Sequence, residues 1–203
     1  MNAIEAGPQL YLVRHGETEW SRSGQHTGKT DIPLTVHGEE QACALAPWLL
    51  EIAFTAVLTS PRQRARTTCA LAGLGTKARI EPDLAEWDYG DYEGLRSEEI
   101  RQTRPGWTVF HDGCPNGETP AAISDRADRL IARLLAMTGN VALFSHGHFG
   151  TVLAARWIGL PVIEAQHLLL GSAALNILGH NPSHPEVRVI SLWNASPDHL
   201  PPG

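Results

Sequence analysis

The stretch that decides the fold is YLVRHGET, residues 11–18. Within it, an apolar run stops abruptly at Arg14, His15 and Gly16. A short apolar run bounded by glycine or proline is typical of a buried strand, so residues 9–14 are predicted to form one. The two side chains that follow either mark the point where the strand reaches the surface or face a negatively charged ligand.

Strand-like and helical patterns alternate along the rest of the chain. Further strands are predicted at 56–59, 79–80, 173–178 and 187–193 and within NVALFSHGH, 140–148, which runs into a polar turn. Helical patterns or start signals mark 35–52, 62–73, 121–137 and 149–159. This alternation predicts an α/β fold, a three-layer sandwich whose mostly parallel central sheet of about six strands carries helices on both faces.

Local signals add detail to this outline. Pro47 is expected to kink the first long helix, and Ser60-Pro61 reads as the cap and first residue of the next one. The irregular stretch around 81–119 holds one short helical candidate, 97–103, and resembles a lid-like insertion. The chain, 1–203, is therefore expected to form a single domain that carries this insertion.

Composition limits the classes of partner. The formal net charge is −6 and the isoelectric point is near 5.9, which argues against a nucleic-acid-binding surface. An anion site would therefore require a local concentration of positive charge. No convincing membrane span or signal peptide is visible, and the three cysteines are widely spaced, as in reduced intracellular thiols. These features predict a cytoplasmic protein with no nucleic-acid or membrane partner, and they leave a homodimer open.

Two of the predicted strands end in the same way, in YLVRHG and ALFSHG. Ligands of open α/β sheets bind beyond the carboxyl ends of the strands, so His15 and His146 are expected to meet in one crevice. The alternative is that each histidine only caps its strand by bonding the backbone. The glycines that follow, Gly16 and Gly147, allow close approach of a ligand and expose N–H groups to an anion.

A third strand end supplies positive charge at the start of a helix. Arg62, Arg64 and Arg66 alternate there, so only one or two of them can share a face toward the crevice. Arginines, imidazoles and a helix N-terminus together fit a phosphate best. The chain has no nucleotide-binding G-x-x-x-x-G-K-[ST] loop and no H-E-x-x-H motif, and His146-Gly-His148 lacks an obvious carboxylate partner. The sequence thus predicts no metal and no other cofactor.

A metal-free phosphatase needs its own nucleophile and a proton donor. A neutral histidine whose ring is oriented through its other nitrogen can attack phosphorus. The lid-like segment offers four carboxylates, Glu86, Asp88, Asp91 and Glu93. The negative charge of a bound phosphate would favour the protonated form of a carboxylate facing it, which could then act as a general acid. Most of the four are expected to be solvated surface charges.

Four motifs in this order resemble one family. RHGET (14–18), TSPRQRA (59–65), LAEWDYGDYEG (84–94) and FSHGH (144–148) are similar to the motifs of the histidine phosphatase superfamily, also called phosphoglycerate-mutase-like. The resemblance covers the chain from Gln9 to Trp193 and implies the phosphoglycerate-mutase-like α/β fold.

The resemblance also implies a mechanism. His15 attacks phosphorus to form a phosphohistidine, Glu86 protonates the leaving group and then activates water, and the phosphoryl oxygens are bound by Arg14, Arg64 and His146. The family pattern selects Arg64 as the second arginine. The remaining predicted substrate contacts are Ser21, Thr27, Gly28, Arg62, Tyr89 and Gly147.

The substrate is expected to be a small phosphate ester. Parts of the chain look most like the fungal sedoheptulose-1,7-bisphosphatase subgroup and its bacterial relatives. A bisphosphate would need a second cationic pocket, for which the rim offers Arg22, Lys29, Arg62, Arg96 and Arg104. Phosphoglycerate mutase, a phosphatase for α-ribazole phosphate or for phosphorylated proteins, and a non-enzymatic module that binds phospho-ligands are the alternatives.

Overall fold

A six-stranded mixed sheet forms the centre of the computed structural model, which describes residues 7–196. Its order is β3-β2-β4-β1-β5-β6, and only β5 runs against the other strands. The strands are β1 (Gln9–Arg14), β2 (Phe54–Thr59), β3 (Ala78–Ile80), β4 (Asn140–Ser145), β5 (Leu175–His180) and β6 (Arg188–Ala195). The prediction of a mostly parallel sheet of about six strands is confirmed.

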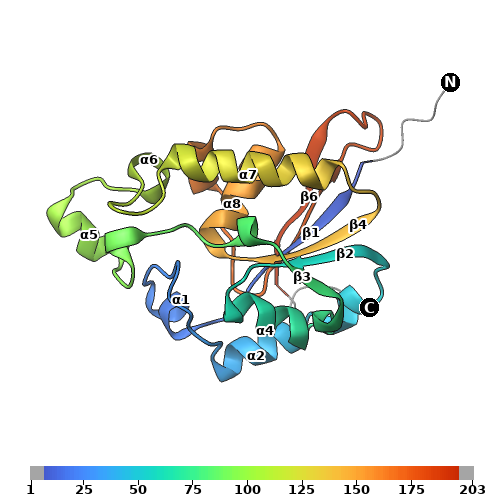
Figure 1. The fold of residues 1–203 in the computed structure, drawn as a ribbon, viewed down its shortest axis with the longest axis horizontal. Helices are drawn as coiled ribbons and strands as arrows, with labels where there is room; N and C mark the ends of the chain where they lie inside the picture. The colour runs from blue at the N-terminus through green and yellow to red at the C-terminus, as the bar shows by residue number, and fades with distance from the viewer. Residues whose placement is uncertain (1–6, 197–203) are drawn as a thin grey trace.

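Helices cover both faces of the sheet, as Figure 1 shows. On one face lie α7 (Pro120–Leu135) and α8 (Gly147–Trp157), and on the other α2 (Val36–Cys43), α3 (Ala46–Leu50) and α4 (Gln63–Leu71). Alternate residues of each central strand supply the two apolar cores: Leu10 and Leu12 pack with α7 and α8, while Val13 packs with α3 and α4. The three-layer arrangement follows from this alternation.

The local predictions for the helices had mixed outcomes. Thr119 caps α7, which covers most of the predicted 121–137 helix, since its hydroxyl accepts a hydrogen bond from the Ala122 N–H. The helix expected around Pro47 is instead two helices, α2 and α3, with the proline in the first turn of α3. The Ser60-Pro61 start was wrong: α4 begins at Gln63, with Arg62 at its cap.

The segment 81–119 forms a lobe beside α1 (Glu19–Ser23), at the left of Figure 1. It contains the predicted helix, α5 (Ser97–Thr103), and a second helix that sequence analysis missed, α6 (Val109–Asp112). The 3-10 turns of the chain are η1 (Gly75–Lys77), η2 (Pro82–Leu84), η3 (Gly90–Tyr92) and η4 (Val162–His167). Within residues 7–196, no helix combines the length and the apolar character that crossing a bilayer requires.

Candidate active site

Strand register brings the two distant histidines together. Arg14 pairs with Ser145 in the parallel β1–β4 ladder, so the residues that follow them leave the sheet side by side. The rings of His15 and His146 lie 5.2 Å apart between centroids, in an edge-on arrangement. Both imidazoles are buried at the carboxyl edge of the sheet, where ligands of such folds bind.

His15 is oriented as a nucleophile. Its Nδ1 lies 2.7 Å from the carbonyl oxygen of Gly16, and because that oxygen can only accept, Nδ1 carries the proton. The lone pair is therefore on Nε2. Burial lowers the pKa of His15 well below 6.5, and the positive charges of Arg64 and Arg14 lower it further. The ring is neutral near pH 7, as attack on phosphorus requires.

Not every N–H group of the Arg14 guanidinium has a hydrogen-bond partner among the described residues. Its Nη1 donates to the carbonyl of Leu170, while its buried Nε has no hydrogen-bond partner among the described residues. An unpaired buried donor costs about 1–3 kcal/mol, so a ligand oxygen that accepts from it would be bound favourably. The side chain lines the same cavity as His15. Arg14 is thus placed to bind an oxyanion next to the nucleophile.

Arg64 lies behind the histidines and is fully buried. Its Nε donates to Nδ1 of His146 at 3.2 Å, and its two terminal nitrogens donate to carbonyl oxygens. The acceptors belong to the loop between α1 and α2, residues 24–35, called the early loop below: Thr27 at 2.9 Å, Gly28 at 3.1 Å and Thr30 at 3.0 Å. These bonds tie the loop to α4 and engage all three nitrogens of the guanidinium.

His146 is held from both sides. Nδ1 accepts from Arg64, and Nε2 lies 2.7 Å from the hydroxyl of Ser60, a residue that sequence analysis treated only as a helix cap. Burial, and after it the charge of Arg64, lowers the pKa of His146 well below 6.5, so the ring is neutral. Neither His146 nor Arg64 is among the described residues that line the cavity. Both stand behind His15.

Glu86 is the one predicted carboxylate, of the four weighed, that lines the cavity. One of its oxygens accepts from the backbone N–H of Trp87 at 2.8 Å and of Phe149 at 2.7 Å, and the other from that of His148 at 3.0 Å. Two of these donors belong to the first turn of α8, whose N-terminus carries partial positive charge. A β-carbon placed on Gly147 would lie within 4 Å of both Glu86 and the Arg14 guanidinium, so the two groups adjoin.

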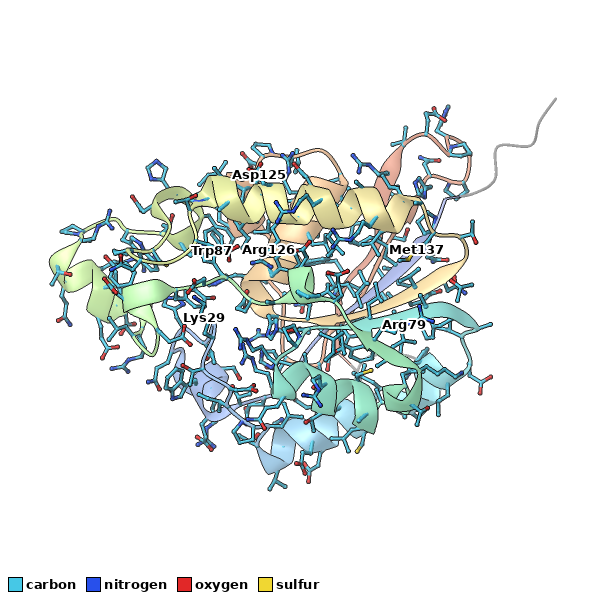
Figure 2. All side chains as sticks on the ribbon, viewed as in Figure 1. Lys29, Arg79, Trp87, Asp125, Arg126 and Met137 are labelled. Carbon is cyan, nitrogen blue, oxygen red and sulfur yellow. The ribbon has the colours of Figure 1, made fainter. Side chains whose placement is uncertain are left out.

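The other three carboxylates have structural partners. Asp88 pairs with Lys29 at 2.6 Å, Asp91 accepts from the side chain of Asn116, and Glu93 accepts from the backbone of the early loop at Gly28. They were expected to be mostly solvated surface charges, but in the structure each of the three is held by a partner. Figure 2 labels Lys29 on the lobe side of the molecule.

A cavity of about 390 Å³ contains the nucleophile. Of the predicted substrate contacts, four line it: Ser21, Thr27, Tyr89 and Gly147. The hydroxyl of Ser21 is already engaged in the capping box of α1. Gly28 and Arg62 do not line the cavity in the described part of the chain. Gly28 packs against the backbone of Trp87 and accepts a hydrogen bond from Arg64 through its carbonyl, and Arg62 is the N-cap residue of α4.

A second cavity of about 250 Å³ adjoins the first and shares His26, Ser97, Phe110, Gln166 and His148 with it. Its lining includes one arginine that sequence analysis did not name, Arg101. The rim cations expected to build a second phosphate pocket line neither cavity among the described residues; three of them pair instead with Glu19, Asp88 and Glu99, namely Arg22, Lys29 and Arg96.

Arg126 of α7 holds the backbone of the segment that carries Glu86 through hydrogen bonds to its carbonyl groups. Figure 2 labels it next to Trp87, on the side of α7 that faces the rest of the molecule. Its guanidinium donates to both carboxylate oxygens of Glu118 at 2.8 and 2.7 Å and to the carbonyl of Glu86 at 3.3 Å. It also stacks over the ring of Phe149 at 4.3 Å. One side chain therefore fixes the acid's backbone to the helix face.

Comparison with known proteins decides the family. The model of the histidine phosphatase superfamily (branch 1) matches residues 10–193. The chain belongs to this superfamily. An acid phosphatase of Mycobacterium tuberculosis is 42% identical over 188 residues, which are 91% of this chain and 92% of that protein. The sedoheptulose 1,7-bisphosphatase of Saccharomyces cerevisiae is 38% identical over an alignment 187 positions long, which covers 76% of this chain and 69% of that protein.

A solved structure agrees with the sequence relatives. The solved structure of an open reading frame product of Mycobacterium tuberculosis superposes on this chain with a TM-score of 0.86 and 39% sequence identity. The match covers 93% of this chain and 98% of the solved chain. The resemblance inferred from the four motifs is confirmed at the level of the superfamily and of its fold. This histidine phosphatase is a phosphomonoesterase, and the non-enzymatic binding module is set aside.

Proposed function

We propose that this histidine phosphatase hydrolyses small phosphomonoesters, sugar phosphates or bisphosphates, through a phosphohistidine and without a metal. The observation that carries the proposal is the tautomer of His15. Its Nδ1–H is fixed on the Gly16 carbonyl, which leaves the Nε2 lone pair beside an arginine, Arg14, with an unpartnered buried donor. A nucleophile and a phosphate anchor thus share one cavity.

In the first step, Nε2 of His15 attacks phosphorus, a P–N bond forms and the P–O bond to the alcohol breaks. The protonated carboxyl of Glu86 gives its proton to the departing oxygen, so the alcohol leaves neutral. In the second step, the Glu86 carboxylate takes a proton from water, whose oxygen attacks phosphorus and breaks the P–N bond. Phosphate leaves, and both groups return to their starting states.

The phosphoryl group would be held by positive charge from the chain itself. Arg14 and the N-terminus of α8 border the cavity directly. Arg64 and His146 lie next to His15 but do not line the cavity among the described residues. In this proposal they bind the phosphoryl oxygens after the substrate replaces one of the hydrogen bonds that they now make within the protein. The sugar class rests on the likeness to the yeast sedoheptulose bisphosphatase.

The test is phosphate release by His15→Ala, with His37→Ala, an exposed histidine on α2, as control. We expect a loss of at least about 10³-fold in kcat for p-nitrophenyl phosphate, because removal of a nucleophile typically costs that much or more. Quenching with base should preserve a base-stable, acid-labile phosphoenzyme in the parent only. Near-parental activity of His15→Ala would end the proposal.

Two further measurements define the reaction. Excess chelator should leave the rate unchanged if no metal takes part. A panel of sugar monophosphates and bisphosphates, scored by released phosphate, ranks the substrates. Isomerisation of 3-phosphoglycerate without phosphate release would favour the mutase alternative, and preference for α-ribazole phosphate or a phosphoprotein would favour the other phosphatases of the superfamily.

A further inference from the structure

The side chain of His148 forms part of the wall of both cavities and has no role in the mechanism above. Its Nδ1 lies 2.6 Å from the hydroxyl of Tyr89. The ring of Phe110 packs edge-on against it at 5.1 Å, and that of His26 lies 5.8 Å away. Three neighbouring rings and one hydrogen bond thus hold the imidazole in a single orientation.

The proton positions in this pair follow from the surroundings. Burial, followed by the negative charge of Glu86, raises the pKa of Tyr89 well above 10, so the phenol keeps its proton. Burial, followed by the charge of Arg14, lowers the pKa of His148 to about 4, so the imidazole is neutral. The phenol has one hydrogen-bond partner in the described chain, Nδ1, to which it therefore donates. The second proton of the pair must then sit on Nε2 of His148.

That Nε2–H faces open space. It makes no hydrogen bond within residues 7–196, and it is not among the buried polar atoms there that lack a partner. Since His148 lines both cavities, the accessible edge of the ring is the one that points into them. The wall beside the catalytic pocket therefore presents a neutral donor surrounded by aromatic rings.

We propose that His148 is a specificity-determining residue, whose Nε2–H donates a hydrogen bond to a hydroxyl or ring oxygen of the substrate's alcohol portion. Tyr89 is its positioning residue, because the phenol fixes the tautomer that makes Nε2 a donor. The inference rests on the proposed function, in which His15 and Arg14 hold the phosphoryl group. Aromatic walls with a few neutral polar groups suit a hydroxylated carbon skeleton.

The tautomer can be measured without substrate. In the ¹⁵N-labelled full-length protein, long-range ¹H–¹⁵N correlation spectra distinguish the two neutral forms of each histidine, and His148→Gln assigns the signal. We expect the Nε2–H form in the parent at pH 7. In Tyr89→Phe the ring should populate the Nδ1–H form as well. A parent ring with its proton on Nδ1 would overturn the proposal.

Kinetics test the contact itself. The readout is the ratio of kcat/KM for a hydroxylated ester, the best of ribose 5-phosphate, fructose 6-phosphate and glycerol 3-phosphate, to kcat/KM for phenyl phosphate, which has no hydroxyl. We expect His148→Leu to lower this ratio about 10-fold, as the loss of one hydrogen bond to substrate implies. His148→Gln, whose amide nitrogen replaces Nε2, should recover most of it, and Tyr89→Phe should give an intermediate ratio.

The outcomes separate this inference from the function on which it rests. Absence of phosphate release from every ester by the parent would contradict the phosphatase proposal. If the parent cleaves phenyl phosphate but none of the hydroxylated esters, the inference fails together with the sugar monophosphates as substrates, while hydrolysis through the phosphohistidine stands. It also fails if His148→Leu lowers kcat/KM for phenyl phosphate and for the hydroxylated ester by the same factor, because His148 would then act on the phosphoryl group or on folding.

Discussion

Nε of Arg64 donates a hydrogen bond to Nδ1 of His146 at 3.2 Å, and the His146 ring in turn lies 5.2 Å from that of His15. A fixed cation therefore sits next to two buried imidazoles. Its charge contributes to the lowered pKa of both rings, after burial as the main cause. Arg64 thus helps to keep the nucleophile unprotonated while it anchors the early loop through three carbonyls.

Replacing Arg64 should move the acid limb of the pH–rate profile. Because His15 attacks as the neutral ring, kcat/KM falls when the pH drops below the pKa of that ring. Arg64→Met removes a positive charge, which raises this pKa, so the acid limb should shift to higher pH. Arg64→Lys keeps the charge and should keep the limb, while kcat/KM falls about 100-fold because the guanidinium fork is lost.

The measurement is kcat/KM for p-nitrophenyl phosphate between pH 4 and 8. Arg79→Met, an exposed arginine on the edge strand β3, serves as the control for charge removal far from the cavity. An acid limb that stays in place in Arg64→Met, with circular dichroism showing a folded protein, would contradict the electrostatic role.

Arg126 should contribute strongly to stability. It pairs with Glu118 in a mostly buried setting, where the side chains are 10% and 19% exposed. Arg126→Met leaves that carboxylate unpaired, so the free energy of unfolding should fall by about 3 kcal/mol, as is typical when a buried pair loses one partner. The control is Arg133→Met on the same helix, an exposed arginine whose ion pairs with Asp83 and Glu81 should contribute less than about 1 kcal/mol.

Urea denaturation of the two variants and of the double variant Arg126→Met/Glu118→Met completes the comparison. The double variant should be less destabilised than the sum of its single changes, because the unpaired charge is gone. Equal losses for Arg126→Met and Arg133→Met would show that Arg126 is an ordinary surface cation. If kcat of Arg126→Met falls at urea concentrations where the variant is still folded, the loss indicates that Glu86 has moved.

The sequence predicted those features that local pattern determines. Alternation of strands and helices indicated the layered sheet, and the histidines at two strand ends indicated a shared crevice, because the ends of neighbouring parallel strands meet at one edge. The partners that fix the site were not visible. Ser60 was assigned to the cap of a helix, yet its hydroxyl faces His146, a contact that depends on the register of β2 against β4.

Arg126 shows where a signal was present but unread. It stands three residues after Ile123 and one before Ala127, on the stripe of α7 that is buried. A charged residue on an apolar stripe indicates a buried partner, here Glu118. His148 carried no such signal, because its pairing with Tyr89 joins segments that only the packing of the lobe brings together. Among the rim cations expected to build a second phosphate pocket, Lys29 pairs with Asp88 of the lobe, whereas Arg22 and Arg96 pair with Glu19 and Glu99, each only three positions away.

His26 should make the stability depend on pH in a mildly acidic range. In the folded protein, burial and the neighbouring His148 lower the pKa of His26 to about 4, while in the unfolded chain it is near 6.5. Between these values the unfolded chain binds more protons, so the free energy of unfolding falls as the pH drops from 6.5 to 4, by about 2–3 kcal/mol for this group.

Urea denaturation at several pH values in this range checks the expectation. His26→Asn should be less stable at pH 7, because the ring stacked on Tyr89 is lost, but its stability should decline less toward pH 4 than that of the parent. His37→Asn, at an exposed site, should keep the parental slope. A parental slope in His26→Asn would show that this imidazole is not kept neutral by folding.

Arg101 should distinguish bisphosphates from monophosphates. It is the only permanent cation among the described residues that line the second cavity, and its Nε donates to the carbonyl of Trp107 at 2.9 Å, which leaves its terminal nitrogens available. A sugar bisphosphate whose reacting phosphate is on His15 could extend its other phosphate toward it. Arg101→Gln should lower kcat/KM for fructose 1,6-bisphosphate about 10-fold, the loss of one charge-assisted hydrogen bond.

The matched substrate is fructose 1-phosphate, which presents the same ester without the second phosphate, and its kcat/KM should change by less than about 2-fold in Arg101→Gln. Arg79→Gln, on β3, controls for the change in net charge. Raising the ionic strength should weaken the parent's preference for the bisphosphate, since Arg101 is an exposed residue. Equal losses on both substrates would place the effect on the packing of α5 and remove Arg101 from substrate recognition.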